Sequence, residues 1–67
     1  MPDKKIIGQR LRKLRGKRSL AVVAKELGVS PMTVWYWENG IQVPRDEMKV
    51  KVALYYKRNV ATLFYKD

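Results

Sequence analysis

The sequence predicts an all-α fold. Apolar residues recur at helical spacing along most of the chain, and glycine, proline and short polar segments separate these repeats. The 67 residues are expected to form one domain, residues 1–67, because a chain of this length buries only about 60% of the surface that its unfolded form exposes.

A first helix is expected to follow Asp3, whose side chain can cap it. Ile7, Leu11 and Leu14 lie at positions i, i+4 and i+7 and give this helix one apolar face, while basic residues occupy the remainder. Residues 16–18 then form a connection to the next helix.

A second helix is expected to begin after Ser19, which can cap it, and to carry Val23, Ala24 and Leu27 on its apolar face. It ends at Gly28, where the chain must adopt a left-handed conformation that disfavours other residues. The small side chain of Ala24 allows another helix to approach closely at a steep angle.

A third helix is expected to follow at once. Val29 fills the corner, Ser30 can accept a hydrogen bond from the next turn, and Pro31 suits the first helical position because it has no N–H to lose. Val34 and Trp37 form the apolar side of this helix. Two short helices joined by so tight a turn indicate a helix-turn-helix.

The remainder of the chain predicts two more helices. Residues 41–44 contain a proline and follow Gly40, which indicates a loop. A fourth helix should begin near residues 45–47, where acidic side chains favour the helix dipole, and residues 50–56 are densely apolar. Asn59 can cap a last short helix that carries Val60, Leu63 and Phe64.

The charge of the chain favours a polyanionic partner. With 15 Lys and Arg against 6 Asp and Glu, the formal net charge is +9, so nucleic acid is the first partner to consider. There is no cysteine or histidine, and the six carboxylates form no paired constellation in the sequence. We therefore expect no enzyme, no catalytic residue, no metal site and no cofactor.

Membrane insertion and secretion are not expected. The longest uncharged stretch, residues 27–37, is too short to span a bilayer and is broken by Gly28 and Pro31. The N-terminus leads into an amphipathic segment and not into the apolar core of a signal peptide. We expect a cytoplasmic, nucleoid-associated protein without a small-molecule ligand, since the predicted helices use the whole chain.

Together these residues resemble the Cro and repressor family of bacterial and phage DNA-binding domains, also called the Xre or lambda-repressor-like family. The resemblance covers nearly the whole chain and rests on Ile7-Gly8-Gln9-Arg10-Leu11, Val23-Ala24, Leu27-Gly28-Val29-Ser30, Trp37-Glu38-Asn39-Gly40 with Pro44, and Leu63-Phe64. It implies a compact five-helix bundle whose third helix lies in the major groove of double-stranded DNA, often as a dimer on two half-sites. It also implies that Trp37 is buried and that Glu38 pairs with Arg15.

The chain departs from the family pattern in three ways. The connection between the first two helices is shorter than in the commonest form. Leu20 stands where many members have a glutamine that contacts the DNA backbone, and we expect it to pack inward. The outward face of the third helix lacks Arg, Lys and Gln, the strongest readers of base edges, so readout would depend on A·T-rich sequence, DNA shape or residues outside the helix.

The expected DNA contacts form two groups. With Val34 and Trp37 inward at about 100° per residue, the outward face of the third helix offers the base contacts, which are Met32, Thr33, Trp35, Tyr36 and Asn39. Phosphate contacts are expected at the starts of the second and third helices and in the following loop, from Lys17, Arg18, Ser19, Ser30 and Gln42. The charge run from Arg10 to Arg18 is equally well explained as a solvated face.

The sequence therefore predicts a sequence-specific DNA-binding transcriptional regulator, a Cro-type repressor of a phage or another mobile element. The alternative is a protein-interaction adaptor or a recombination accessory factor that uses the face of Met32, Trp35 and Tyr36; RNA binding is less favoured because this fold offers no stacking sheet. A homodimer through the C-terminal helices is expected to use Tyr56, Val60, Phe64 and Tyr65, unless most of these belong to the core.

Overall fold

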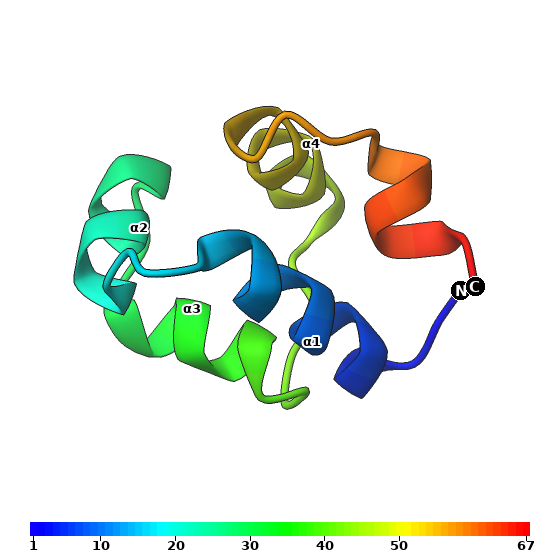
Figure 1. Ribbon diagram of the computed structural model, residues 1–67, viewed down its shortest axis with the longest axis horizontal. Coiled ribbons are helices and arrows are strands. Elements are labelled where there is room, and N and C mark those ends of the chain that lie inside the picture. The colour runs from blue at the N-terminus through cyan, green and yellow to red at the C-terminus, as the bar shows by residue number, and fades with distance from the viewer.

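Five helices and no strand make up the protein. The structure is a computed structural model that describes residues 1–67, and it measures 28 × 21 × 21 Å along its principal axes. Figure 1 shows helix α1 running through the middle of the molecule, with α3 on one side and α4 on the other. The elements are α1 (Lys4–Arg15), α2 (Leu20–Leu27), α3 (Pro31–Glu38), α4 (Asp46–Tyr55) and η1 (Ala61–Tyr65).

Each of the first three helices begins with the cap that its sequence predicts. The Asp3 carboxylate accepts hydrogen bonds from two backbone N–H groups of α1, and the hydroxyls of Ser19 and Ser30 accept one each from Val22 and Thr33. Gly28 ends α2 in the left-handed conformation, with φ 74° and ψ 30°. These local bonds satisfy backbone groups that the helices themselves leave without partners.

The core lies where α1, α2, α3, α4 and η1 meet. Leu14, Leu20 and Val29 are partly buried and pack against it, so Leu20 does lie inward. Twelve buried apolar residues form this core: Ile7, Leu11, Val23, Ala24, Leu27, Val34, Trp37, Val52, Ala53, Tyr56, Leu63 and Phe64. The position of α3 against α1 and α2 is therefore fixed by burial of Val34 and Trp37, which leaves its opposite face outside.

Helices α1 and α3 approach each other backbone to backbone at Gly8. A Cβ atom built on Gly8 would lie 2.4 Å from the carbonyl oxygen of Glu38 and 2.7 Å from that of Trp37. No side chain fits at such distances. Gly8 thus sets the depth at which α3 sits against α1.

A buried ion pair closes the same interface further along α1, again at Glu38 of α3. Arg15 donates to both carboxylate oxygens of Glu38, from Nε at 2.8 Å and from Nη2 at 3.0 Å. The side chain of Glu38 is only 3% exposed, against 18% for Arg15. The hydrogen bond that Arg15 donates to Glu38 raises the pKa of Arg15, and the pairing that the family resemblance implies is confirmed.

The C-terminal segment differs from the sequence expectation in its geometry. The last helix forms, but η1 is a π-helix in which the N–H of Lys66 donates to the carbonyl of Ala61 at 2.7 Å. Asn59 caps this segment as predicted, since its side-chain oxygen accepts from the N–H of Ala61 at 2.8 Å. Tyr56 and Phe64, expected at a dimer contact, are instead core residues because α4 and η1 use them to cover α1.

Helix α4 also buries a lysine that sequence patterning misses. Lys49 is 7% exposed, and its Nζ donates to the Tyr65 hydroxyl at 2.9 Å and lies 3.9 Å from the sulfur of Met1. The bond to Tyr65 raises the pKa of Lys49, so the ammonium form is favoured. Burial raises the pKa of nearby Tyr56 to about 12. None of the helices has the length and apolar character that crossing a membrane requires.

Candidate nucleic-acid interface

The outward face of α3 carries an uncharged, largely apolar surface. Met32 is 52% exposed and Trp35 is 39% exposed, while Val34, Trp37 and Glu38 of the same helix are buried. No basic residue lies in α3. The helix therefore presents side chains that can touch thymine methyl groups or other apolar groups, and its attraction for DNA must come from charges elsewhere in the chain.

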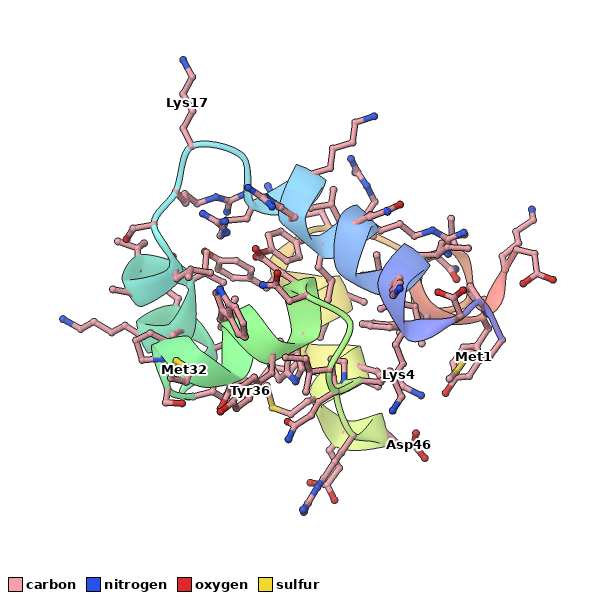
Figure 2. The ribbon with its side chains drawn as sticks, turned by 90° about the horizontal axis from the view of Figure 1, so that it is seen from below. Met1, Lys4, Lys17, Met32, Tyr36 and Asp46 are labelled. Atoms are coloured by element: carbon pink, nitrogen blue, oxygen red, sulfur yellow. The ribbon has the colours of Figure 1, made fainter.

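Tyr36 and Thr33 are less accessible than Met32 and Trp35. Both are half-buried, and the ring of Tyr36 packs edge-on against that of Trp35 with 5.8 Å between the ring centroids. The Thr33 hydroxyl lies 2.9 Å from that of Ser30, so its polar atom is engaged at the start of α3. In Figure 2, the labelled Met32 and Tyr36 lie along α3, with Tyr36 pointing away from the helix.

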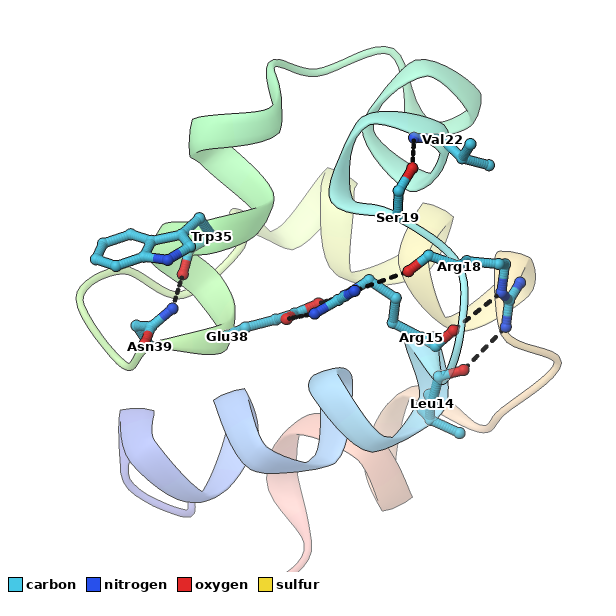
Figure 3. Close-up of polar contacts among 8 residues, drawn as sticks. All are labelled: Leu14, Arg15, Arg18, Ser19, Val22, Trp35, Glu38 and Asn39. Carbon is cyan, nitrogen blue, oxygen red and sulfur yellow. Dashed lines mark hydrogen bonds and ion pairs between the residues drawn. The ribbon is translucent and has the colours of Figure 1, made fainter.

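Asn39 lies at the C-terminal end of α3, and its amide group is partly engaged. Its side-chain nitrogen donates to the carbonyl oxygen of Trp35 at 2.9 Å, as Figure 3 shows. The bond leaves the amide oxygen and one N–H free for a base edge. Met32 and Trp35 lie nearer the N-terminal end of α3 than Asn39 does.

The two capping serines bring the starts of α2 and α3 into the candidate interface. Ser19 uses its oxygen to accept from the N–H of Val22 at 3.1 Å, which leaves the hydroxyl hydrogen free to donate. Ser30 accepts from the N–H of Thr33 at 3.2 Å. Free N–H groups and hydroxyl donors at a helix start are suited to a phosphate oxygen.

Arg18 has a structural position that the sequence does not reveal. Its Nη2 donates to the carbonyl of Leu14 at 2.9 Å and its Nε to that of Arg15 at 3.2 Å, so it caps the end of α1 (Figure 3). The guanidinium also lies 5.3 Å from the ring centroids of both Tyr55 and Tyr56. These contacts use two of the five N–H donors of the guanidinium and give Arg18 a structural role at the end of α1.

Lys17 is the free cation of the same connection. It is exposed and makes no hydrogen bond or ion pair inside the chain. Figure 2 shows its side chain extending from the tip of the connection between α1 and α2. Of the two basic residues expected to contact phosphate, Lys17 is therefore the better candidate.

The loop after α3 is attached to the end of that helix. The backbone N–H groups of Ile41 and Gln42 donate to the carbonyl of Tyr36 at 3.0 and 3.3 Å. Gln42 is exposed, as a phosphate contact requires. Ile41 is 49% exposed and is a further exposed apolar residue in the loop after α3, which helical periodicity does not reveal.

Comparison with known proteins agrees with this arrangement. The solution structure of the SOS-response transcriptional repressor LexA from Eubacterium rectale is similar, with a TM-score of 0.86 and 28% identity over 97% of this chain and 71% of that one. No curated protein matches the chain. The helix-turn-helix domain family matches residues 6–59, which is most of the chain. The chain belongs to the helix-turn-helix domain family.

Proposed function

We propose that the chain is a sequence-specific regulator of transcription of the Cro type, which reads double-stranded DNA by placing α3 in the major groove. The observation that carries this proposal is the division of α3 into a buried face with Val34 and Trp37 and an exposed face with Met32 and Trp35. Such a helix is held firmly by the core and is free to enter a groove. The net charge of +9 supplies attraction for the phosphate backbone.

Base recognition is assigned to Met32, Trp35 and Tyr36, with Thr33 and Asn39 at the sides. The lack of Arg, Lys and Gln on this face favours contacts with thymine methyl groups and selection of DNA by shape. Phosphate contacts are assigned to Lys17, Ser19, Ser30 and Gln42, and Arg18 contributes mainly by holding α1 and α4 in place.

Selection from a random duplex-DNA library at near-physiological salt tests base recognition. The native protein is expected to yield a sequence motif, and Trp35→Ala and Tyr36→Ala are expected to relax it while salt-sensitive binding to any duplex persists. Loss of one good base contact costs about 1–3 kcal/mol of discrimination. Gln9→Ala is the control, because Gln9 is exposed on α1 and belongs to none of the proposed contacts.

Two results of this selection would contradict the proposal. One is an unchanged motif in both α3 variants, which would place recognition outside the helix. The other is that the native protein retains duplex DNA but selects no sequence motif. Circular dichroism of each variant checks that it is folded, because Tyr36 is half-buried and its replacement can destabilise the domain.

Salt dependence separates the roles of Lys17 and Arg18. Lys17→Ala is expected to lower affinity equally for all duplexes and to flatten the plot of log K against log salt by roughly one unit, as loss of one phosphate contact does. Arg18→Ala is expected to lower the free energy of unfolding by about 1 kcal/mol instead, because it removes two hydrogen bonds to carbonyls and the stacking on the tyrosines. A flatter slope for Arg18→Ala with unchanged stability would return Arg18 to the phosphate contacts.

A protein-interaction role is the second candidate function. The observation in its favour is the exposed apolar surface formed by Met32, Trp35 and Ile41, since Met and aromatic residues are enriched at interface centres. Failure of the library selection would favour this role or an accessory role in recombination. The charge of +9 exceeds what such an interface requires and favours DNA.

A homodimer through the C-terminal helices forms part of the proposal, with a revised surface. Of the four expected residues, Tyr56 and Phe64 are buried and Val60 is partly buried, whereas Tyr65 is 45% exposed and stays available. Val50 and Leu54, one turn apart on α4, are 51% and 74% exposed and offer an apolar contact in their place. Sedimentation equilibrium at micromolar concentration reports the association state.

A further inference from the structure

A positively charged surface lies away from α3, in a groove between α1 and η1. Its volume is about 560 Å³. Gly8 faces α3, whereas Arg10 bonds to η1, and two residues of α-helix correspond to about 200° of rotation. The groove and α3 therefore lie on opposite sides of α1. Four cations line it: Arg10, Lys13, Arg58 and Lys66.

One of these cations is fixed and the others are free. Arg10 Nη1 donates to the carbonyl oxygens of Thr62 and Leu63, both at 3.1 Å, and so holds η1 against α1. The side chains of Lys13, Arg58 and Lys66 make no hydrogen bond or ion pair inside the chain. One wall of the groove is η1, which contributes Thr62 and Leu63.

The groove combines positive charge with apolar surface. Leu14 and Leu63 line it between the basic side chains, and Asp67 is its single carboxylate. Burying an apolar side chain there and pairing three free cations with anions would both favour association. The matching ligand carries carboxylates and apolar groups on the same segment.

We propose that this groove binds an acidic peptide segment of a partner protein. Carboxylates of the segment pair with Lys13, Arg58 and Lys66, and an apolar side chain packs on the partly exposed Leu14, beside Leu63, which is 4% exposed. A second DNA duplex fits less well, because its phosphates lie on a broad convex rod and offer nothing apolar to the two leucines. This inference does not depend on DNA binding by α3, and both surfaces can be occupied at once.

A titration of the ¹⁵N-labelled protein followed by NMR tests where such a peptide binds. The probe is a short synthetic peptide rich in Asp and Glu that contains two leucines, and the reference is the same peptide with serine in place of leucine. Amide shifts are expected at residues 13, 58 and 62–66, with α3 unchanged, and weaker binding of the serine peptide. Shifts confined to α3, or equal affinity for the two peptides, would overturn the proposal.

A matched pair of charge variants tests the cations. Lys13→Glu with Arg58→Glu changes two groove residues, and Lys25→Glu with Lys51→Glu changes two exposed lysines elsewhere, so both double variants alter net charge equally. Peptide affinity is expected to fall about tenfold or more in the first and about twofold in the second. Equal losses in the two double variants would show attraction by net charge alone and would overturn the proposal.

Binding of duplex DNA by the same variants distinguishes the two macromolecules. If a peptide is the occupant, the groove variant loses no more affinity for duplex DNA than the control variant. A larger loss in the groove variant would assign the groove to DNA and overturn the peptide. If the library selection yields no motif, DNA reading by α3 is rejected. The comparison of the groove and control variants still tests the peptide proposal.

Discussion

Arg15→Ala is expected to lower the free energy of unfolding by about 2–3 kcal/mol. The substitution leaves the carboxylate of Glu38, whose side chain is 3% exposed, without its two hydrogen bonds from Arg15. Removing one partner of a buried pair costs about 3–5 kcal/mol, and the partial exposure of Arg15 reduces this figure. Urea unfolding followed by tryptophan fluorescence measures the loss, since Trp37 lies in the core.

The controls for Arg15→Ala lie on the same pair of helices. Arg12→Ala removes an exposed cation one turn earlier on α1, whose side chain makes no hydrogen bond or ion pair. We expect it to change the free energy of unfolding by no more than about 0.5 kcal/mol. The double variant Arg15→Met with Glu38→Met removes both charges and is expected to regain part of the stability. If Arg15→Ala costs no more than Arg12→Ala, the pair does not join α1 to α3 in the way described.

Gly8→Ala is expected to destabilise the domain by about 2 kcal/mol. The new methyl group would meet the carbonyl oxygens of Glu38 and Trp37, which are backbone atoms and cannot rotate aside. Overpacking of this kind costs about 1–3 kcal/mol, and the gain from replacing glycine within a helix returns only about 1 kcal/mol. We expect the overpacking cost to lie at the upper end of this range because the contacts involve backbone. Subtracting the gain from replacing glycine leaves the net loss of about 2 kcal/mol.

Urea unfolding also measures the effect of Gly8→Ala. Gln9→Ala, at the next and exposed position of α1, is the control and is expected to stay within about 0.5 kcal/mol of the native protein. A stability of Gly8→Ala equal to that of the control would mean that α1 and α3 can separate slightly without loss. Because α3 carries the proposed base contacts, we also expect the shift of this helix to weaken DNA binding.

The features that the sequence predicts correctly depend on neighbours within one turn. The caps at Asp3, Ser19 and Ser30 and the left-handed Gly28 each involve groups only a few residues apart, so composition and spacing suffice. The inward side of α3 follows likewise from helical periodicity, and burial of Val34 and Trp37 confirms it.

The features that the sequence misses depend on contacts between distant segments. Arg18 looks like a free cation until α4 brings Tyr55 and Tyr56 beneath it. Tyr56 and Phe64 look available for a dimer until η1 packs on α1. The basic groove likewise exists only because Arg10 meets Thr62 and Leu63, more than fifty positions further along the chain.

The two ends of the chain meet at one buried side chain. Lys49 contacts Met1 and Tyr65 together, and Figure 1 shows the N- and C-terminal ends next to each other. A linker of a few residues would suffice to join the two ends. The entropic cost of closing so short a linker is small. The exposed connection at Gly16 and Lys17 then offers a place for new ends, which makes this domain well suited to circular permutation.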